Sequence, residues 1–245
     1  MKTTVHIFSI LCLLSLLCLV SCKESGSNNK TITGDTVIEK QEITVSIYNE
    51  IKVEGAIDVV YEAKPDEAAF LEVEADENII PLVDIKVKGK TLHIKARESI
   101  NPSRFTVYTN SPNLKYIESK GASKVLLKGT IEGNDMKIEL KGTGNIHAEN
   151  LIYEKGEFKL EGSGNMEIGG EINKAKYEIS GNGNIDAPDM AVTDLECKIK
   201  GTGNMKVNPI EKMSIEITGK GDISYKGNPQ ITKQKIKGSG TVKTL

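Results

Sequence analysis

Hydrophobic and polar residues alternate along most of the chain, and from about residue 121 the alternation is tied to a recurring Gly-x-Gly-Asn tetrapeptide. Successive units, counting degenerate ones, begin with glycines that are 18 to 21 residues apart. These leading glycines are Gly121, Gly142, Gly162, Gly181, Gly201, Gly219 and Gly238. A fixed period near twenty residues indicates a stacked array of equivalent structural units.

Each unit divides its residues between two faces of a strand. Positions two and four before the leading glycine, and four and six after it, are apolar in nearly every unit, as in Ile138 and Leu140. Even offsets place these side chains on one face, which we expect to face the core. The glycines share this parity, so the chain must bend or approach its neighbour closely there. The repeat residues to which we assign this structural role are Gly142, Gly144, Asn145, Gly162, Gly164, Asn165, Gly181, Gly183, Asn184, Gly201, Gly203 and Asn204.

Three residues before each leading glycine, the charge alternates in sign from one unit to the next. The series is Glu139, Lys159, Glu178, Lys198, Glu216 and Lys235. If successive units are in-register neighbours about 4.8 Å apart, every charge faces an opposite one. In an up-and-down meander with two strands per unit, the same residues would be second neighbours and the alternation would contribute little. The pattern therefore favours an all-β fold with a β-solenoid or β-helix-like array over 121–245, and the meander is the alternative.

The repeated asparagines raise two ligand-binding alternatives. Gly-x-Gly-Asn lacks the third glycine and the following helix of a dinucleotide-binding fingerprint, and it recurs where a nucleotide site would occur once. Calcium binding, as in glycine-rich nonapeptide repeats, needs more carboxylates than four asparagines and Asp222 supply. We therefore expect a hydrogen-bonded amide ladder at a turn, with no cofactor and no metal.

Residues 35–120 also alternate, but they do not share the twenty-residue period. Candidate strands lie at 43–48, 51–62, 70–75, 83–87, 91–96 and 104–109, and Lys88-Gly89-Lys90 is expected at a hairpin tip. This N-terminal β region is either a separate sheet packed on the array or a set of irregular first coils. The pattern leaves both arrangements open.

The first residues indicate export. Lys2 precedes about 14 mostly apolar residues that end at Val20, a run too short to span a membrane and typical of a secretory signal. The junction L-V-S-C, which ends at Cys22, resembles a bacterial lipoprotein signal. We therefore expect a signal peptide over 1–21, acylation of Cys22 and a polar, flexible tether over 22–34. The alternative is an ordinary signal peptide with an incidental cysteine.

Candidate residues for chemistry are few. Besides Cys22, the mature chain holds only Cys197, whose inward parity predicts a small buried hydrophobic residue. His93 and His147 each lie between apolar residues, which predicts exposed, isolated imidazoles. No zinc-ligand spacing or catalytic triad can be identified, so a non-enzyme is expected. The net charge of −2 gives no attraction to nucleic acid.

The order of these features resembles the head GIN domain family of adhesin-like proteins, a domain of unknown function common in envelope lipoproteins. The resemblance rests on Ile51-Lys-Val-Glu-Gly-Ala-Ile-Asp-Val-Val, on Thr91-Leu-His-Ile and on the G-x-G-N-I/M units, and it covers nearly all of the mature chain. Asp222 and Thr241 replace Asn in the last two units, and the unit at Gly121 lacks the second glycine. The resemblance implies a β-helix-like fold and a role in adhesion or surface structure, and it carries no catalytic residues.

Two functions follow as expectations. The first is a lipid-anchored, non-catalytic surface adhesin or binding scaffold of the outer membrane. Such a protein would bind a protein or glycan ligand through a patch near Tyr153, Tyr177 and Tyr225 or through the N-terminal half. The second is a lipoprotein of the same membrane that faces the periplasm and has a structural or regulatory role.

Overall fold

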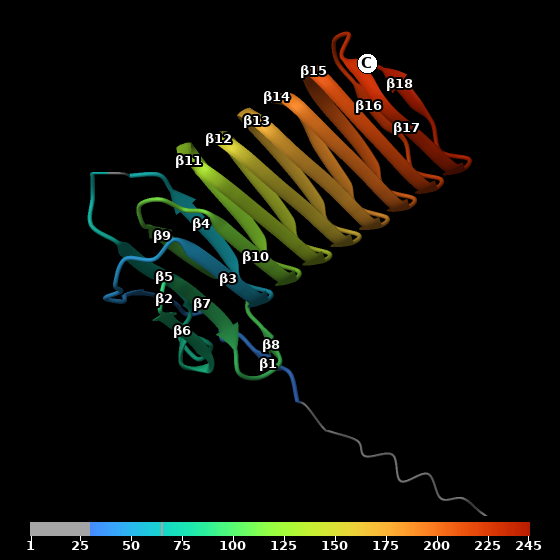
Figure 1. Ribbon diagram of the computed structural model, residues 1–245. Coiled ribbons are helices and arrows are strands. Elements are labelled where there is room, and N and C mark those ends of the chain that lie inside the picture. Colours follow the sequence, from blue (N-terminus) through green and yellow to red (C-terminus); the bar gives the residue numbers. More distant parts are fainter. Residues whose placement is uncertain (1–29, 65) are drawn as a thin grey trace, which may run out of the picture.

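The protein is a β-solenoid. The computed structural model describes residues 30–64 and 66–245, and nearly all of its regular structure is β-strand (Figure 1). The regular turns of the coil are β11 (Lys124–Gly142), β12 (Asn145–Gly162), β13 (Asn165–Gly181), β14 (Asn184–Gly201) and β15 (Asn204–Gly219). Each pairs in parallel with the next. The solenoid is therefore confirmed, and the up-and-down meander is wrong.

One sequence repeat makes one turn of the solenoid. The leading glycines are aligned across the strands, so that Gly142 pairs with Gly162 and Gly162 with Gly181. Each turn is a single strand that runs from the asparagine of one Gly-x-Gly-Asn unit to the leading glycine of the next. The strand bends around the coil at β-bulges, where the register shifts, as between Ala148 and Leu151.

The hydrophobic core fills the inside of the coil. The even positions that flank the leading glycines are buried in the regular turns, as in Phe158 and Ile179. The predicted burial of the inward face is wrong near the C-terminal end, where Tyr225 and Ile236 are half-buried and Gln234 is exposed. These residues keep the inward parity, but no further described turn covers them.

The N-terminal strands continue the same solenoid as irregular first turns. β3 (Glu50–Gly55) pairs in parallel with β10 (Tyr116–Gly121), which places Gly55 beside Gly121. β4 (Asp58–Glu62) pairs with β11. β7 (Thr91–Ala96) and β9 (Phe105–Asn110) then extend the two faces beyond β3 and β4. Of the two arrangements that the sequence left open, the structure thus has the irregular first coils.

Antiparallel strands finish this end of the stack. β6 (Val83–Lys88) and β7 form the expected hairpin around Gly89. On the other face, β5 (Phe70–Asp76) pairs with β9, and β2 (Ile38–Glu42) pairs with β5. A 3₁₀ helix (Ile80–Leu82) leads into β6. Because the strand direction changes here, the parallel stack does not extend past these edges.

Asp76 secures the segment where the described chain begins. Its buried carboxylate accepts hydrogen bonds from the Thr36 N–H (2.8 Å), the Ser103 N–H (2.7 Å) and the Ser103 hydroxyl (2.6 Å). Burial alone raises the pKa of Asp76, but these hydrogen bonds outweigh burial and hold its pKa below the ordinary value. The carboxylate is therefore ionised and ties the chain before β2 to the loop before β9.

The boundary expected for the tether is corrected by this segment. β1 (Ile32–Thr33) pairs in parallel with β8 (Ile100–Asn101), so the chain is already in a strand inside the range 22–34 that was assigned to a tether. A strand of two residues is too short to show an alternating pattern, so the sequence analysis did not identify β1 and placed the end of the tether too late. The expected signal peptide, 1–21, and Cys22 lie outside the described residues.

The last described turn lies at the opposite end of the solenoid from β1 (Figure 1). It consists of β16 (Ile223–Tyr225), β17 (Gln230–Gly238) and β18 (Val242–Thr244). β17 pairs with β15, and β18 pairs with β16, both in parallel. Within the described residues, no helix is long and apolar enough to cross a membrane.

A compact ion network joins the irregular turns to the regular ones. Glu118 and Glu139 are in-register neighbours on β10 and β11, and both are nearly buried. The Lys141 Nζ lies 2.9 Å from Oε1 of Glu118 and 2.8 Å from Oε2 of Glu139. Lys120 and Lys52 also contact Glu118, at 3.1 and 3.4 Å, and Lys137 contacts Glu139 at 2.8 Å. The lysines thus offset the repulsion between two adjacent carboxylates.

The lysines lower the pKa values of both carboxyl groups. Burial raises the pKa of Glu139, but hydrogen bonds from Lys137 and Lys141 outweigh burial and lower this pKa to about 2. The same balance lowers the pKa of Glu118. Because the folded-state pKa of Glu139 is depressed, its contribution to stability is complete above the unfolded value of about 4.5 and is lost as the pH falls toward 2.

Replacement of a leading glycine by alanine is expected to destabilise the protein strongly. In Gly181→Ala, the new methyl group would collide with the Gly162 carbonyl, and the residue would keep an unfavourable φ of +135°. We expect a loss of about 3 kcal/mol or more in the free energy of unfolding, measured by urea denaturation. The control is Gly89→Ala, where φ is +64° and the surroundings are open, with an expected loss of about 1 kcal/mol. Equal losses in the two variants would contradict the close approach.

Replacement of Lys141 by methionine is expected to have a pH-dependent effect. At pH 7, Lys141→Met should lower the free energy of unfolding by about 1–3 kcal/mol, because two nearly buried carboxylates lose their shared partner. The difference from the wild type should shrink between pH 4.5 and 2 as Glu139 becomes protonated in the wild type. Lys128→Met, an exposed change on the same strand, is the control. A pH-independent difference between Lys141→Met and the wild type would contradict the ion network.

Candidate functional site

The Gly-x-Gly-Asn corners are structural in the way that the sequence predicted. The Gly142 carbonyl accepts hydrogen bonds from the N–H groups of Ser163 (3.0 Å) and Gly164 (3.1 Å) in the next turn. Gly142 itself has φ +128°, and a side chain on Gly144 would overlap the Ser123 carbonyl. The backbones therefore approach so closely that neither position has room for a Cβ atom. Corresponding positions in the later turns are occupied by Gly162, Gly164, Gly181, Gly183, Gly201 and Gly203.

The asparagines form the expected amide ladder along one edge of the solenoid. The Asn165 Nδ2 donates to Oδ1 of Asn145 (3.1 Å), and the Asn184 Nδ2 donates to Oδ1 of Asn165 (3.0 Å). The Asn204 backbone N–H and Nδ2 both donate to Oδ1 of Asn184. Asp222 extends the ladder by accepting from the Thr241 N–H (2.8 Å). The amide groups are thus occupied by one another, and the described residues contain no cluster of potential metal ligands.

The charged column is in register, but its ion pairs differ from the expected ones. Glu178 pairs with Lys198 in the strand register, yet its carboxylate contacts Lys176 in its own strand and Lys200 diagonally, each at 3.2 Å. Among the expected neighbours, Glu216 and Lys235 form a direct pair at 3.6 Å. The long side chains reach residues two positions away, because lysines flank the column on both sides.

The remaining candidate residues are separated from one another. Cys197 is buried, as predicted, and burial raises the pKa of its thiol. The His147 Nδ1 lies 3.3 Å from Glu167, and the imidazole is partly exposed. His93 is half-buried on β7. Burial, and then nearby lysines, lower its pKa.

The suggested tyrosine patch is wrong. Tyr153 and Tyr177 are buried in the core, and Tyr225 is half-buried at the last turn. The Tyr153 hydroxyl donates a hydrogen bond of 2.5 Å to the Leu114 carbonyl. The inward parity of Tyr177 already predicted its burial. Tyr153 lies at an odd offset from Gly142, and it is buried because the buried parity changes at the β-bulge between Ala148 and Leu151.

A groove with a lysine-rich rim lies along one corner of the solenoid, and sequence reasoning missed it. Its volume is about 390 Å³, and we call it the corner groove. Its floor follows one register column, in which Gly156 pairs with Ala175 and Ala175 pairs with Leu195. A side chain on Gly156 would collide with Phe158 and Ile172. The groove could have been found from the position six residues before each leading glycine. Gly156 and Ala175 are small there, whereas the next turns carry Leu195 and Met213.

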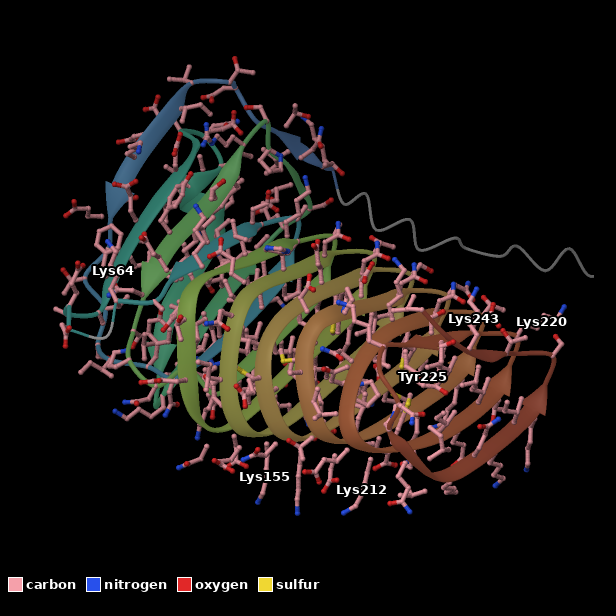
Figure 2. The ribbon with its side chains drawn as sticks, turned by 90° about the horizontal axis from the view of Figure 1, so that it is seen from above. Lys64, Lys155, Lys212, Lys220, Tyr225 and Lys243 are labelled. Carbon is pink, nitrogen blue, oxygen red and sulfur yellow. The ribbon has the colours of Figure 1, made fainter. Side chains whose placement is uncertain are left out.

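The rim of the corner groove is mostly cationic. Lys155, Lys174, Asp194 and Lys212 occupy successive positions of one register column. Figure 2 shows Lys155 and Lys212 on the same side of the coil. The Asp194 carboxylate lies 3.9 Å from the Lys212 Nζ, and its buried Oδ1 accepts no hydrogen bond. The arrangement can contact acidic groups through its lysines and apolar groups through its floor.

A second groove lies at the opposite end of the molecule from β18. It has a volume of about 630 Å³ and lies between the edge strand β2 and the β6 hairpin. Its floor is apolar and includes Ile43, Pro81 and Val83, whereas Glu39 and Glu77 stand at its rim. The two grooves therefore differ in the sign of their charged rims.

Comparison with protein families gives a match over residues 47–229 to the family described as "Putative auto-transporter adhesin, head GIN domain". Comparison with curated proteins returns no match. The matched range covers the first irregular turns and all of the regular ones. The match therefore concerns most of the solenoid and not an isolated motif, and β17 and β18 of the last turn lie outside it.

Solved structures from Bacteroides and Parabacteroides species share the fold. A protein from Bacteroides fragilis NCTC 9343, described as a putative adhesin, is 27% identical over 87% of this chain and 100% of its own, with a TM-score of 0.83. A Parabacteroides distasonis ATCC 8503 protein, described as a putative lipid binding protein, is 29% identical over 88% of this chain and 100% of its own, with a TM-score of 0.74. A putative adhesin from Parabacteroides merdae ATCC 43184 is 27% identical over 88% and 99%, with a TM-score of 0.70.

These relatives are described as adhesins or lipid-binding proteins and not as enzymes. An adhesin-like family indicates a protein of the cell surface or envelope. The family match extends over most of the described solenoid, and its repeat glycines and asparagines have the structural roles found above. The chain belongs to the head GIN domain family of adhesin-like proteins.

Proposed function

We propose that this protein is a lipid-anchored, non-catalytic adhesin or binding scaffold, held in the outer membrane and displayed at the cell surface. The observation that carries the proposal is the placement of the two ends. The described chain begins beside β1 at one end of the solenoid, and β17 and β18 lie at the other (Figure 1). A lipid on Cys22 would hold the first turns toward the membrane and present the last turns away from it.

The proposed ligand is a protein or a glycan that the scaffold binds without chemical change. Supporting features are the in-register stack, which keeps the outer faces in a fixed geometry, and the corner groove, which offers lysines above an apolar floor. The non-catalytic role is supported by the separation of the candidate residues. Cys197 is inaccessible in the core, and His93 and His147 lie on different strands without a nucleophile between them.

Loss of the acylated cysteine is expected to release the protein. A triacylated Cys22 should keep the chain in the membrane fraction, because several acyl chains bind a bilayer far more firmly than one. Cys22→Ala should leave the protein soluble or unprocessed, as measured by fractionation and by gel migration. A variant that fractionates and migrates like the wild type would contradict the lipid anchor. Cys197→Ala, a change in the core, is the matched control.

Protease added to intact cells is expected to shed a folded fragment. Lys30 is exposed and precedes the first paired residue, Ile32, so trypsin should cut there before it cuts the stacked strands. The fragment should begin near Thr31 by mass spectrometry, while periplasmic control proteins stay intact. A Lys23→Gln and Lys30→Gln double variant should shed much less fragment. Protection in intact cells, with digestion only after the outer membrane is opened, would instead support the periplasm-facing structural or regulatory role.

A further inference from the structure

The last described turn exposes a strand edge. β17 pairs with β15 on one side, and within the described residues no strand pairs with its other side. β18 likewise pairs with β16 alone. An unpaired edge presents a row of backbone N–H and C=O groups that can bind another extended chain.

The exposed edge carries a concentrated positive charge. Residues 220–245 contain six lysines and one aspartate, which gives 6 − 1 = +5 in a chain whose total is −2. Lys233, Lys235 and Lys237 occupy alternate positions of β17 and are all exposed. Figure 2 shows Lys220 and Lys243 projecting from the same end of the stack.

The charged column of the solenoid ends at Lys235, which has an opposite charge on one side only. Inside the array, each of its lysines lies between glutamates of the two adjacent turns, as Lys198 lies between Glu178 and Glu216. Lys235 has Glu216 on one side, at 3.6 Å, and no strand of the described residues on the other. The next position in the column is therefore one where an acidic residue would be stabilised.

The inward face of the same turn is incompletely covered. Ile231, Ile236 and Val242 are only half-buried, although the equivalent positions of earlier turns are buried. Gln234 stands where earlier turns carry Phe158 or Ile215. An added strand would thus meet a polar residue and then an apolar one between the three lysines.

We propose that the free edge of β17 binds an extended acidic segment of a partner protein as an additional parallel strand. The segment carries Asp or Glu at three alternate positions opposite Lys233, Lys235 and Lys237. Between them it carries a polar residue over Gln234 and an apolar residue over Ile236. The backbone hydrogen bonds supply affinity, and the alternating carboxylates supply selection.

A second copy of this chain does not satisfy these requirements. Another β17 would place lysines opposite lysines. At the far end of a second copy, the edge strand β6 carries Asp84, Lys86 and Lys88 at alternate positions, so two of its three charges repel the edge. The other edge strand, β2, alternates Glu39 with Gln41 and Lys40 with Glu42, so neither of its faces offers three acidic residues in a row. The lysines therefore disfavour self-stacking and admit an acidic strand from a different protein.

This inference names the partner class for the proposed binding role and rests on that role. In the proposed orientation, β17 lies at the end away from the membrane, where a partner can reach it (Figure 1). Binding to purified protein reports on the edge alone, whereas cell-surface exposure is measured separately by protease shedding. The two results are thus distinguishable.

The test uses the full chain purified in detergent and fluorescent nonapeptides. The probe is Thr-Val-Thr-Glu-Gln-Glu-Ile-Glu-Gly. A permuted peptide of the same composition, with its glutamates adjacent, and a peptide with lysine in place of each glutamate are the controls. Three opposite-charge contacts should make the probe bind about 3- to 150-fold more tightly than the permuted peptide in fluorescence anisotropy. Binding should weaken with salt, and bound probe should slow hydrogen exchange within 230–238.

Charge reversal provides the decisive variant. Lys233→Glu, Lys235→Glu and Lys237→Glu are combined with Glu216→Lys, which preserves the pairing inside the last turn. This variant should no longer bind the acidic probe and should bind the lysine peptide. Lys88→Glu, at the opposite end, should leave the binding of both peptides unchanged. Equal binding of the permuted peptide, protection outside 230–238, or no binding of the acidic probe would overturn the proposal.

Discussion

The close approach of backbones at the glycine corners is the constraint on which the rest of the structure depends. The carbonyls of four leading glycines each accept two N–H groups from the next turn, as Gly142 does from Ser163 and Gly164. This geometry leaves no space for a Cβ atom and fixes the register of successive strands. Because the side-chain period of a strand is two, a slip of one residue would turn the apolar face outward. The corners therefore determine which residues form the core, the amide ladder and the charged column.

The same stacking explains where ligand contacts can occur. The corner asparagines are occupied by one another, and the regular outer faces are filled by interleaved ion pairs. The exceptions are places where the repeat changes. Gly156 and Ala175 lower the floor of the corner groove, and the antiparallel strands β2 and β6 border the second groove. At β17 the described stack ends, so the outer edge of this strand pairs with no other strand of the described residues, and its lysines have acidic neighbours on the β15 side alone.

The repeat could be predicted from the sequence because it obeys local rules. The period gives the length of a turn, the parity gives the buried face, and the recurring glycines give the close approach. Tyr177, expected at the surface, obeys the parity and is buried. Tyr153 is buried against the parity, because it follows the β-bulge between Ala148 and Leu151. The individual ion pairs could not be predicted in this way, because Glu178 contacts Lys200 diagonally and not its register partner Lys198. Long-range pairings such as β3 with β10, and β1 with β8, have no periodic signal and required the structure.

Amide hydrogen exchange at the corners tests the central claim most directly. The Ser163 and Gly164 N–H groups occupy a turn, where amides usually contact solvent, yet here they donate to the Gly142 carbonyl at 3.0 and 3.1 Å. Residue-resolved exchange by NMR should show these amides protected as strongly as those of the buried strands, with protection falling toward β17. Exchange of Ser163 and Gly164 at the rate of an open turn, while the strands stay protected, would contradict the account.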